Sequence, residues 1–120
     1  MGLDMYAYKT REQVTEYGFD FPDDTIKIGY WRKHPNLHGW MERLYRLKGG
    51  DEEFNCVTLR LDLADINALE KVVINNRLPH TEGFLFGESR PENKELDLAF
   101  IKAARQAISE GYIIVYTSWW

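Results

Sequence analysis

The 120-residue sequence has a single cysteine, Cys56, which therefore has no partner for an internal disulfide bond. A lone thiol is typical of reducing compartments, where disulfides do not persist. The sequence also lacks an apolar run of about 20 residues, the length that a membrane-spanning helix needs. Its start has neither the basic segment nor the apolar run of a secretory signal. We therefore expect a cytoplasmic protein that does not enter a membrane.

Positive charge is also in short supply. Lys and Arg total 15 against 19 Asp and Glu, and the net charge is -4. A protein that coats nucleic acid needs a large excess of cations against the phosphates, so the net charge argues against this class. A small local basic site remains compatible with the total. The length is close to the commonest domain size, and the hydrophobic share of 44% is ordinary for a globular chain. We expect one globular domain over residues 1–120.

The spacing of apolar residues predicts four strands and three helices. The strands are expected at residues 3–9, 25–31, 54–61 and 112–118, and the helices at 35–48, 62–75 and 92–110. Residues 10–24 are polar and rich in turn formers, with room for a short helix over 11–17. This order predicts an α+β fold, with about three helices packed on a small mixed sheet of about four strands.

Helix ends and buried sides follow from the same patterns. Pro35 suits the first turn of a helix, and Asp62 is a typical helix cap. The residues expected to face the core are Leu37, Trp40, Leu44 and Leu47 in the first helix, Leu63, Ile66, Leu69 and Val73 in the second, and Leu98, Ile101, Ala104 and Ile108 in the third.

Residues 30–40 concentrate aromatic, cationic and imidazole side chains between a predicted strand and a predicted helix. Arg32 and Lys33 precede the helix, where its dipole disfavours cations by up to about 1 kcal/mol. An anion held between them and the free N–H groups would offset this cost, and a neighbouring aromatic ring would stack a base. The candidate ligand-binding residues are Tyr30, Trp31, Arg32, Lys33, His34 and His38, and the expected ligand is a nucleotide or phosphate-like anion.

A purely structural interpretation of the same residues stays open. Arg32 and Lys33 would then pair with Asp4, Asp23 or Asp24 and hold the loop. Asp4 lies in an apolar strand and is expected to accept hydrogen bonds, because buried carboxylates need partners. His38 would be a partly buried hydrogen-bonding residue between aromatic rings.

The histidines also support an alternative, a small hydrolase or nuclease that uses His34, His38 or His80, with or without a metal. The spacing of His34 and His38 would present both to a metal, but Pro35 stands where the zinc-peptidase pattern has Glu. Cys56 would be either a nucleophile activated by a histidine or an inert, packed thiol. No catalytic constellation is complete, so enzyme activity stays open, and we expect no cofactor and no metal.

Trp119 and Trp120 follow the last predicted strand. Core packing is favoured for these rings over a patch for a partner. The C-terminal strand could also pair with its own copy and form a homodimer.

Five segments together resemble a group of small phage and prophage proteins of unknown function. They read GLDMY (2–6), YWRK with LHGW (30–33 and 37–40), FNC (54–56), LPHTEGFLFG (78–87) and YTSW (116–119). The resemblance extends over nearly the whole chain and implies a phage accessory protein in the cytoplasm of the host bacterium. Together with the 30–40 cluster, it favours a non-enzymatic binding module for a host or defence protein or a nucleotide-like anion.

Overall fold

The structure is a computed structural model that describes residues 2–11 and 25–120. Its elements in chain order are β1 (Asp4–Thr10), β2 (Ile26–Arg32), α1 (Pro35–Leu47), β3 (Leu59–Leu61), α2 (Leu63–Ile74), α3 (Asn93–Ser109) and β4 (Ile113–Trp119). These are the predicted strands and helices in the predicted order. The short helix considered over residues 11–17 falls almost wholly outside the described residues. No helix in the described ranges is long and apolar enough to span a bilayer.

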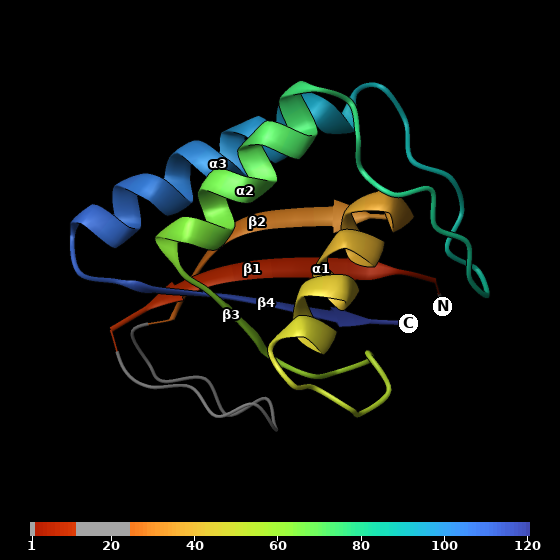
Figure 1. Ribbon diagram of the computed structural model, residues 1–120, viewed down its shortest axis with the longest axis horizontal. Coiled ribbons are helices and arrows are strands. Elements are labelled where there is room, and N and C mark those ends of the chain that lie inside the picture. Colours follow the sequence, from red (N-terminus) through yellow and green to blue (C-terminus); the bar gives the residue numbers. More distant parts are fainter. Residues whose placement is uncertain (1, 12–24) are drawn as a thin grey trace.

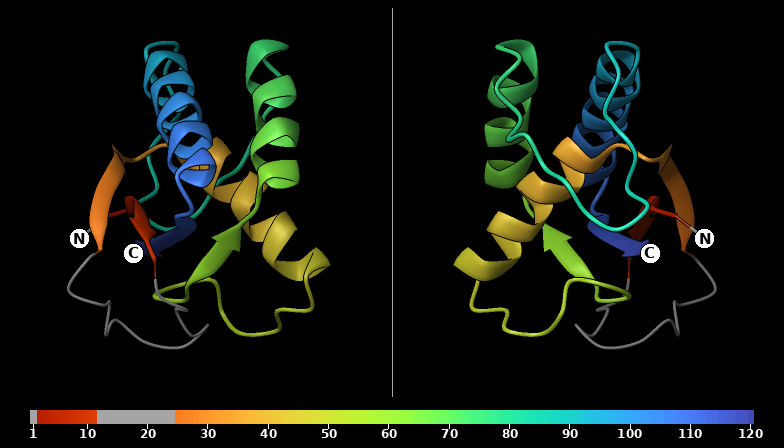
Figure 2. Two further views of the ribbon diagram at one scale, coloured as in Figure 1. Left: turned by 90° about the vertical axis from the view of Figure 1, so that its left-hand side faces the viewer. Right: turned by 90° about the vertical axis from the view of Figure 1, so that its right-hand side faces the viewer.

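The strands form one sheet in the order β2-β1-β4-β3, and each pair of neighbours is antiparallel. The predicted α+β class is confirmed, although the sheet is antiparallel where a mixed one was expected. β3 and β4 are antiparallel because α2 and α3, which run in opposite directions between them, bring the chain back to the edge of the sheet where β3 ends (Figure 1). All three helices cover the same face of the sheet, with α2 and α3 side by side (Figure 1, Figure 2).

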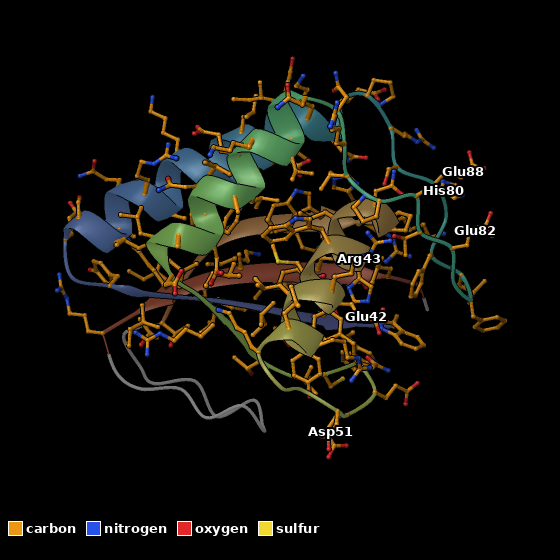
Figure 3. The ribbon with its side chains drawn as sticks, viewed as in Figure 1. Glu42, Arg43, Asp51, His80, Glu82 and Glu88 are labelled. Carbon is orange, nitrogen blue, oxygen red and sulfur yellow. The ribbon has the colours of Figure 1, made fainter. Side chains whose placement is uncertain are left out.

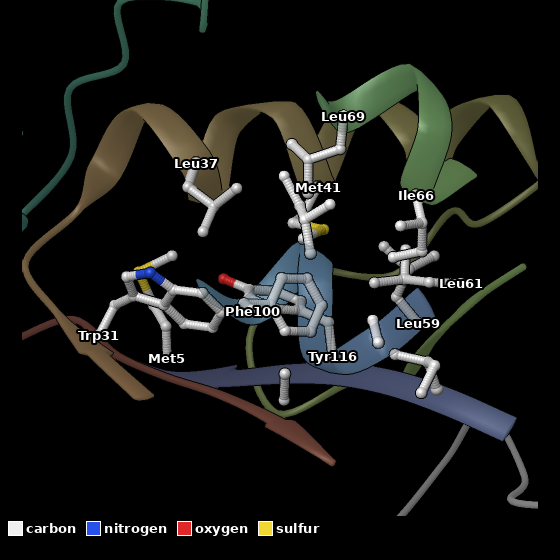
Figure 4. Packing of buried hydrophobic residues seen from close by; sticks show 14 of the residues in the cluster. Met5, Trp31, Leu37, Met41, Leu59, Leu61, Ile66, Leu69, Phe100 and Tyr116 are labelled. Carbon is white, nitrogen blue, oxygen red and sulfur yellow. The ribbon is translucent and has the colours of Figure 1, made fainter. Parts of the chain in front are cut away.

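The core lies between the helices and the covered face of the sheet. Alternate strand residues such as Met5 and Tyr116 are buried on this face, because side chains along a strand point to opposite sides. Leu37, Ile66 and Phe100 meet them from the three helices (Figure 4). Burying one such side chain is worth about 1.5–3 kcal/mol, so this layer supplies most of the drive to fold.

The buried side of α1 differs from the prediction. Leu37 is buried and Trp40 and Leu44 are partly buried, but Leu47 is 84% exposed because it lies on the side of the helix opposite to the buried Tyr45. Met41 and Tyr45 take the inner positions, so the true stripe is 37, 41 and 45. Two further corrections are that Leu63 is exposed in α2 and that the buried stripe of α3 includes Phe100, Ala107 and a carboxylate, Asp97.

The predicted strand over residues 54–61 is confirmed only at its end. Cys56 has φ +64, which breaks an extended strand, so the regular ladder with β4 covers only Leu59–Leu61, although the Cys56 N–H still donates to the Ser118 carbonyl of β4. The turn brings Asn55 to the C-terminus, where its carboxamide bonds to both the N–H and the C=O of Trp120. Long-range bonds from the Asn55 side chain to Trp120 therefore take the place of a regular ladder at this point.

The C-terminal tryptophans have different surroundings. Trp120 stacks edge-on against Phe86 at 5.2 Å and donates its indole N–H to the Phe54 carbonyl, whereas Trp119 is 67% exposed. Core packing is therefore confirmed for Trp120 only. β4 itself lies between β1 and β3, so the expectation that it pairs with its own copy in a homodimer is wrong. Its backbone groups already pair with β1 on one side and β3 on the other.

Candidate functional site

A sharp turn between β2 and α1 divides the predicted 30–40 cluster. Lys33 has φ +56, a left-handed conformation that costs a residue with a side chain roughly 1–2 kcal/mol. Its N–H donates to the Leu3 carbonyl at 2.8 Å, which holds the turn against β1. The candidate residues then separate into an exposed group, Tyr30, Arg32 and Lys33, and a buried group, Trp31, His34 and His38.

The exposed group is built around Asp4. The Tyr30 hydroxyl and the Arg32 guanidinium each donate to the same Asp4 oxygen at 2.8 Å. Burial raises the pKa of Asp4, but these two hydrogen bonds and the Arg32 charge outweigh it, so the pKa lies below its usual value. The expected pairing of Arg32 with Asp4 is confirmed, while Asp23 and Asp24 fall outside the described residues. The Arg32 charge is thus offset by an internal carboxylate.

His38 is held among aromatic rings. Its Nδ1 lies 2.7 Å from the Tyr116 hydroxyl, and its ring centroid is 5.0 Å from Phe54 and 5.3 Å from Phe86. Burial lowers the pKa of His38 to about 4, so the imidazole is neutral at pH 7. The structural interpretation of His38 is confirmed in this respect.

His34 belongs to a different kind of cluster. Its Nε2 lies 3.0 Å from Asp97 Oδ2, and its Nδ1 lies 2.6 Å from the Ser89 hydroxyl. The other oxygen of Asp97 accepts the indole N–H of Trp31 at 3.0 Å. Trp31, His34 and Asp97 are all buried, and Ser89 is partly exposed. We call these four residues the His34 network.

Ser89 and Asp97 were missed by sequence reasoning. Ser89 lies 55 residues from His34 in a loop, where no local pattern marks it. Asp97 did leave a signal, because it occupies the inner stripe of α3 one turn before Phe100 and Ile101. A carboxylate at such a position needs a buried partner, which the sequence could have suggested but not identified.

The network also closes the start of α1. His34 occupies the cap position but its side chain makes no capping bond, and the free Asn36 N–H donates instead to the Ser89 hydroxyl at 3.0 Å. The Asn36 carboxamide oxygen accepts the Thr81 N–H at 3.0 Å. Gly39 makes this contact possible, since any Cβ there would collide with the Thr81 side chain. The loop between α2 and α3 is thereby docked on the first turn of α1.

A pocket of about 360 Å³ opens beside this network, between the starts of α1 and α3 and the end of α2. We call it the donor pocket; its polar lining is His34, Asn36, Asn76, Ser89, Arg90, Asn93, Lys94 and Asp97. Asp97, its single carboxylate, already accepts from Trp31 and His34. The lining is therefore rich in cations and amides.

The three asparagines of the donor pocket use their carbonyl oxygens internally. Asn36 accepts from the Thr81 N–H, Asn93 from the Arg90 N–H at 2.7 Å, and Asn76 from the Lys94 ammonium at 3.2 Å. These donors have no lone pair to offer, so the assignment of oxygen and nitrogen in each carboxamide is determined. The NH₂ groups bond to no described residue and remain available as donors.

His80 and Cys56 do not join the network. His80 is exposed on the loop between α2 and α3, 3.3 Å from the Glu82 carboxylate (Figure 3). Burial raises the pKa of the Cys56 thiol, which makes it a weaker nucleophile. Among the described residues, no group of three or more His, Cys, Asp and Glu side chains is placed to hold a metal ion.

The fold and the pocket define a small α+β domain with helices on one face of its sheet and a polar pocket where two helices begin. No family model, curated protein or solved structure matches the chain. The resemblance to phage and prophage proteins therefore stays a prediction, and inference about function rests on the geometry of the site.

Proposed function

We propose that the protein is a binding module for a small anionic ligand, such as a phosphate ester, held in the donor pocket. The observation that carries the proposal is the chemistry of the lining. Arg90 and Lys94 contribute two positive charges, and three carboxamides contribute N–H donors, while the lone carboxylate is already satisfied. Such a lining is complementary to phosphate or carboxylate oxygens.

The charges of the pocket are not neutralised locally. The Lys94 ammonium donates to the Ile74 carbonyl and to Asn76, which are both uncharged acceptors at 3.2 Å. Within the described residues, neither Lys94 nor Arg90 forms an ion pair with a carboxylate. In a chain with net charge -4, two such cations at one pocket favour an anion there.

The volume limits the size of the ligand. Pockets for small molecules usually span roughly 300–1,000 Å³. At about 360 Å³ the donor pocket suits a nucleoside monophosphate or a smaller phosphate ester. This proposal keeps the predicted nucleotide-like anion and two residues of the predicted segment, His34 and Asn36. The cations that would bind the anion are now Arg90 and Lys94, where the sequence had suggested Arg32 and Lys33.

Isothermal titration calorimetry with inorganic phosphate, nucleoside monophosphates and cyclic nucleotides tests the proposal. We expect at least one of them to bind, and Lys94→Met to weaken that binding by about tenfold or more, because a charge-assisted hydrogen bond is worth roughly 1.5–3 kcal/mol. Lys102→Met is the matched control, since Lys102 is exposed on the same helix. Absence of heat from all ligands, or equal effects of the two variants, would contradict the proposal.

A second candidate, binding of a host or defence protein, is favoured by the tip of the loop between α2 and α3. Phe84 is 76% exposed, and its neighbour Leu85 has φ +59, a costly conformation for a branched side chain. Exposed rings at a protruding tip are typical anchors of protein interfaces.

Capture of proteins from a bacterial lysate tests this candidate. We expect a specific protein to be retained by the wild-type chain and lost with Phe84→Ser. Leu47→Ser is the control, because Leu47 is an equally exposed apolar residue at the end of α1. A protein retained equally by both variants would count against the loop tip as the anchor.

A further inference from the structure

We propose that Ser89 is a nucleophile, with His34 as its general base and Asp97 as the residue that positions His34. The activity would be the hydrolysis of a small ester whose acyl part carries an anion. This inference rests on the proposed function only for that anion, which the donor pocket would hold.

The hydrogen bonds of the His34 network run in the order that activates an alcohol. The Asp97 carboxylate accepts the hydrogen bond of the N–H at Nε2 of His34. This leaves Nδ1, which lies 2.6 Å from Ser89 Oγ, as the acceptor for the hydroxyl proton. The Asn36 N–H donates to a lone pair of the same hydroxyl, and Trp31 fixes the second oxygen of Asp97. A nucleophile, a base within hydrogen-bond reach and a third group that orients the base are the features of such catalytic sites.

The burial of the three groups fits the same roles. His34 is 3% exposed and Asp97 2%, whereas Ser89 is partly exposed and lines two pockets. On one side lies the donor pocket, and on the other a pocket of about 500 Å³ that includes His80, Thr81 and Glu88. A substrate that spans Ser89 can therefore place its anionic acyl part in the donor pocket and its leaving group in the second pocket.

The reaction proceeds in two balanced halves. Ser89 Oγ adds to the carbonyl carbon of the ester while its proton passes to Nδ1 of His34. The tetrahedral adduct then expels the alkoxide, which takes that proton and leaves as an alcohol. A water molecule adds to the acyl-Ser89 carbonyl and gives a proton to Nδ1, and Ser89 departs with that proton as the acid is released.

A cap function for Ser89 and a buried ion pair would explain each contact separately. They do not require a base and a nucleophile to meet beside two pockets. The distinguishing property is reactivity, because a hydroxyl that only caps a helix has no enhanced reactivity towards electrophiles.

The test uses the full chain and a fluorophosphonate probe, in which Ser89 would displace fluoride from phosphorus. Intact mass and peptide mapping should show a single adduct at Ser89. Labelling should disappear in Ser89→Ala, fall by about 100-fold or more in His34→Ala, and fall less in Asp97→Asn. Ser109→Ala, on the exposed surface of α3, should label like the wild type.

A cysteine substitution separates reactivity from structure. Ser89→Cys serves as the second variant if Ser89→Ala does not fold. Its thiol should react with iodoacetamide at least about tenfold faster than Cys56 of the same molecule, which acts as the internal reference.

Two results would overturn the inference. One is the absence of an adduct on the folded wild-type chain between pH 6 and 9. The other is an equal labelling rate in His34→Ala. Phosphate binding without labelling would contradict the role of Ser89 as a nucleophile but support the anion site. Labelling without anion binding would support the nucleophile but contradict the anion site.

Discussion

Two buried histidines lie four residues apart at the start of α1, His34 at the cap position and His38 inside the helix, yet their surroundings have little in common. His38 bonds to a tyrosine hydroxyl and packs against two aromatic rings, and burial disfavours its protonated form. His34 meets a carboxylate and a serine and lies beside an open pocket. The comparison shows that one helix start supplies both a packing histidine and a candidate chemical group, according to what the rest of the chain places against each ring.

The largest expected effect concerns the Asp97 carboxylate, which bonds to His34. Asp97→Ala leaves the Trp31 indole N–H and His34 without their shared acceptor in the core. Leaving a buried donor unsatisfied costs about 1–3 kcal/mol for each of the two groups, which urea unfolding would measure. Asp51→Ala, in an exposed loop, should stay within about 0.5 kcal/mol of the wild type (Figure 3). A loss below about 1 kcal/mol in Asp97→Ala would show that the Asp97 carboxylate does not stabilise the buried surroundings of His34.

The second prediction uses the titration of His38. The unfolded imidazole takes up a proton near pH 6.5, but the folded one only near its pKa of about 4. The unfolded state binds more protons across this window, so stability falls as the pH drops from 7 to 4, by about 3 kcal/mol from this residue. His38→Gln removes the titrating group and should lose that much less stability over the same range.

Urea unfolding of both proteins at pH 7 and pH 4 makes the comparison, and His80→Gln serves as the exposed control. Equal losses in the wild type and His38→Gln would show that His38 is not held neutral by its apolar surroundings.

The third effect isolates the hydroxyl that bonds to the His38 ring. Tyr116→Phe removes the hydroxyl 2.7 Å from Nδ1 and leaves a buried nitrogen unsatisfied, at a cost of about 1–2 kcal/mol. Tyr112→Phe is the matched control, because the Tyr112 hydroxyl bonds to no described residue. Equal unfolding midpoints for Tyr116→Phe and the wild type would contradict the hydrogen bond.

The smallest effect is expected at the exposed end of the His34 network. Ser89→Ala removes the acceptor for the Asn36 N–H, and the loss of such a cap costs about 1 kcal/mol. Water can reach a partly exposed position, which limits the loss. Unfolding in urea should therefore rank Ser89→Ala well below Asp97→Ala. Similar losses in the two variants would mean that Ser89 acts as a buried structural residue.

Prediction from the sequence succeeded where the signal is local. Asp62 was expected to cap a helix, and it accepts the Asp65 N–H while Asp65 returns a bond to the Asp62 N–H. These partners are three residues apart, so side-chain chemistry and helix geometry suffice to place them. The α+β class followed in the same way from apolar spacing.

Prediction was wrong or incomplete where distant parts of the chain decide the outcome. The pattern over residues 54–61 predicts one extended strand. The hydrogen bonds between the Asn55 side chain and Trp120, together with the positive φ at Cys56, shorten it. Leu47 follows the helical spacing of Trp40 and Leu44 but is exposed, because the buried side of α1 runs through Met41 and Tyr45. Spacing reports which residues share a side of a helix, but packing decides which side faces the core.

The sequence alone determined the order of the helices and strands, the capping of α2 and the concentration of polar groups at residues 30–40, because each depends on neighbours a few residues apart. Only the tertiary structure decided that Arg32 is paired with Asp4, that His38 packs among aromatic rings and bonds to Tyr116, and that His34 meets Ser89 and Asp97. Those contacts join residues 28 to 78 positions apart. They form because packing three helices on one sheet face brings distant loops and helix starts together, and no local pattern encodes that meeting.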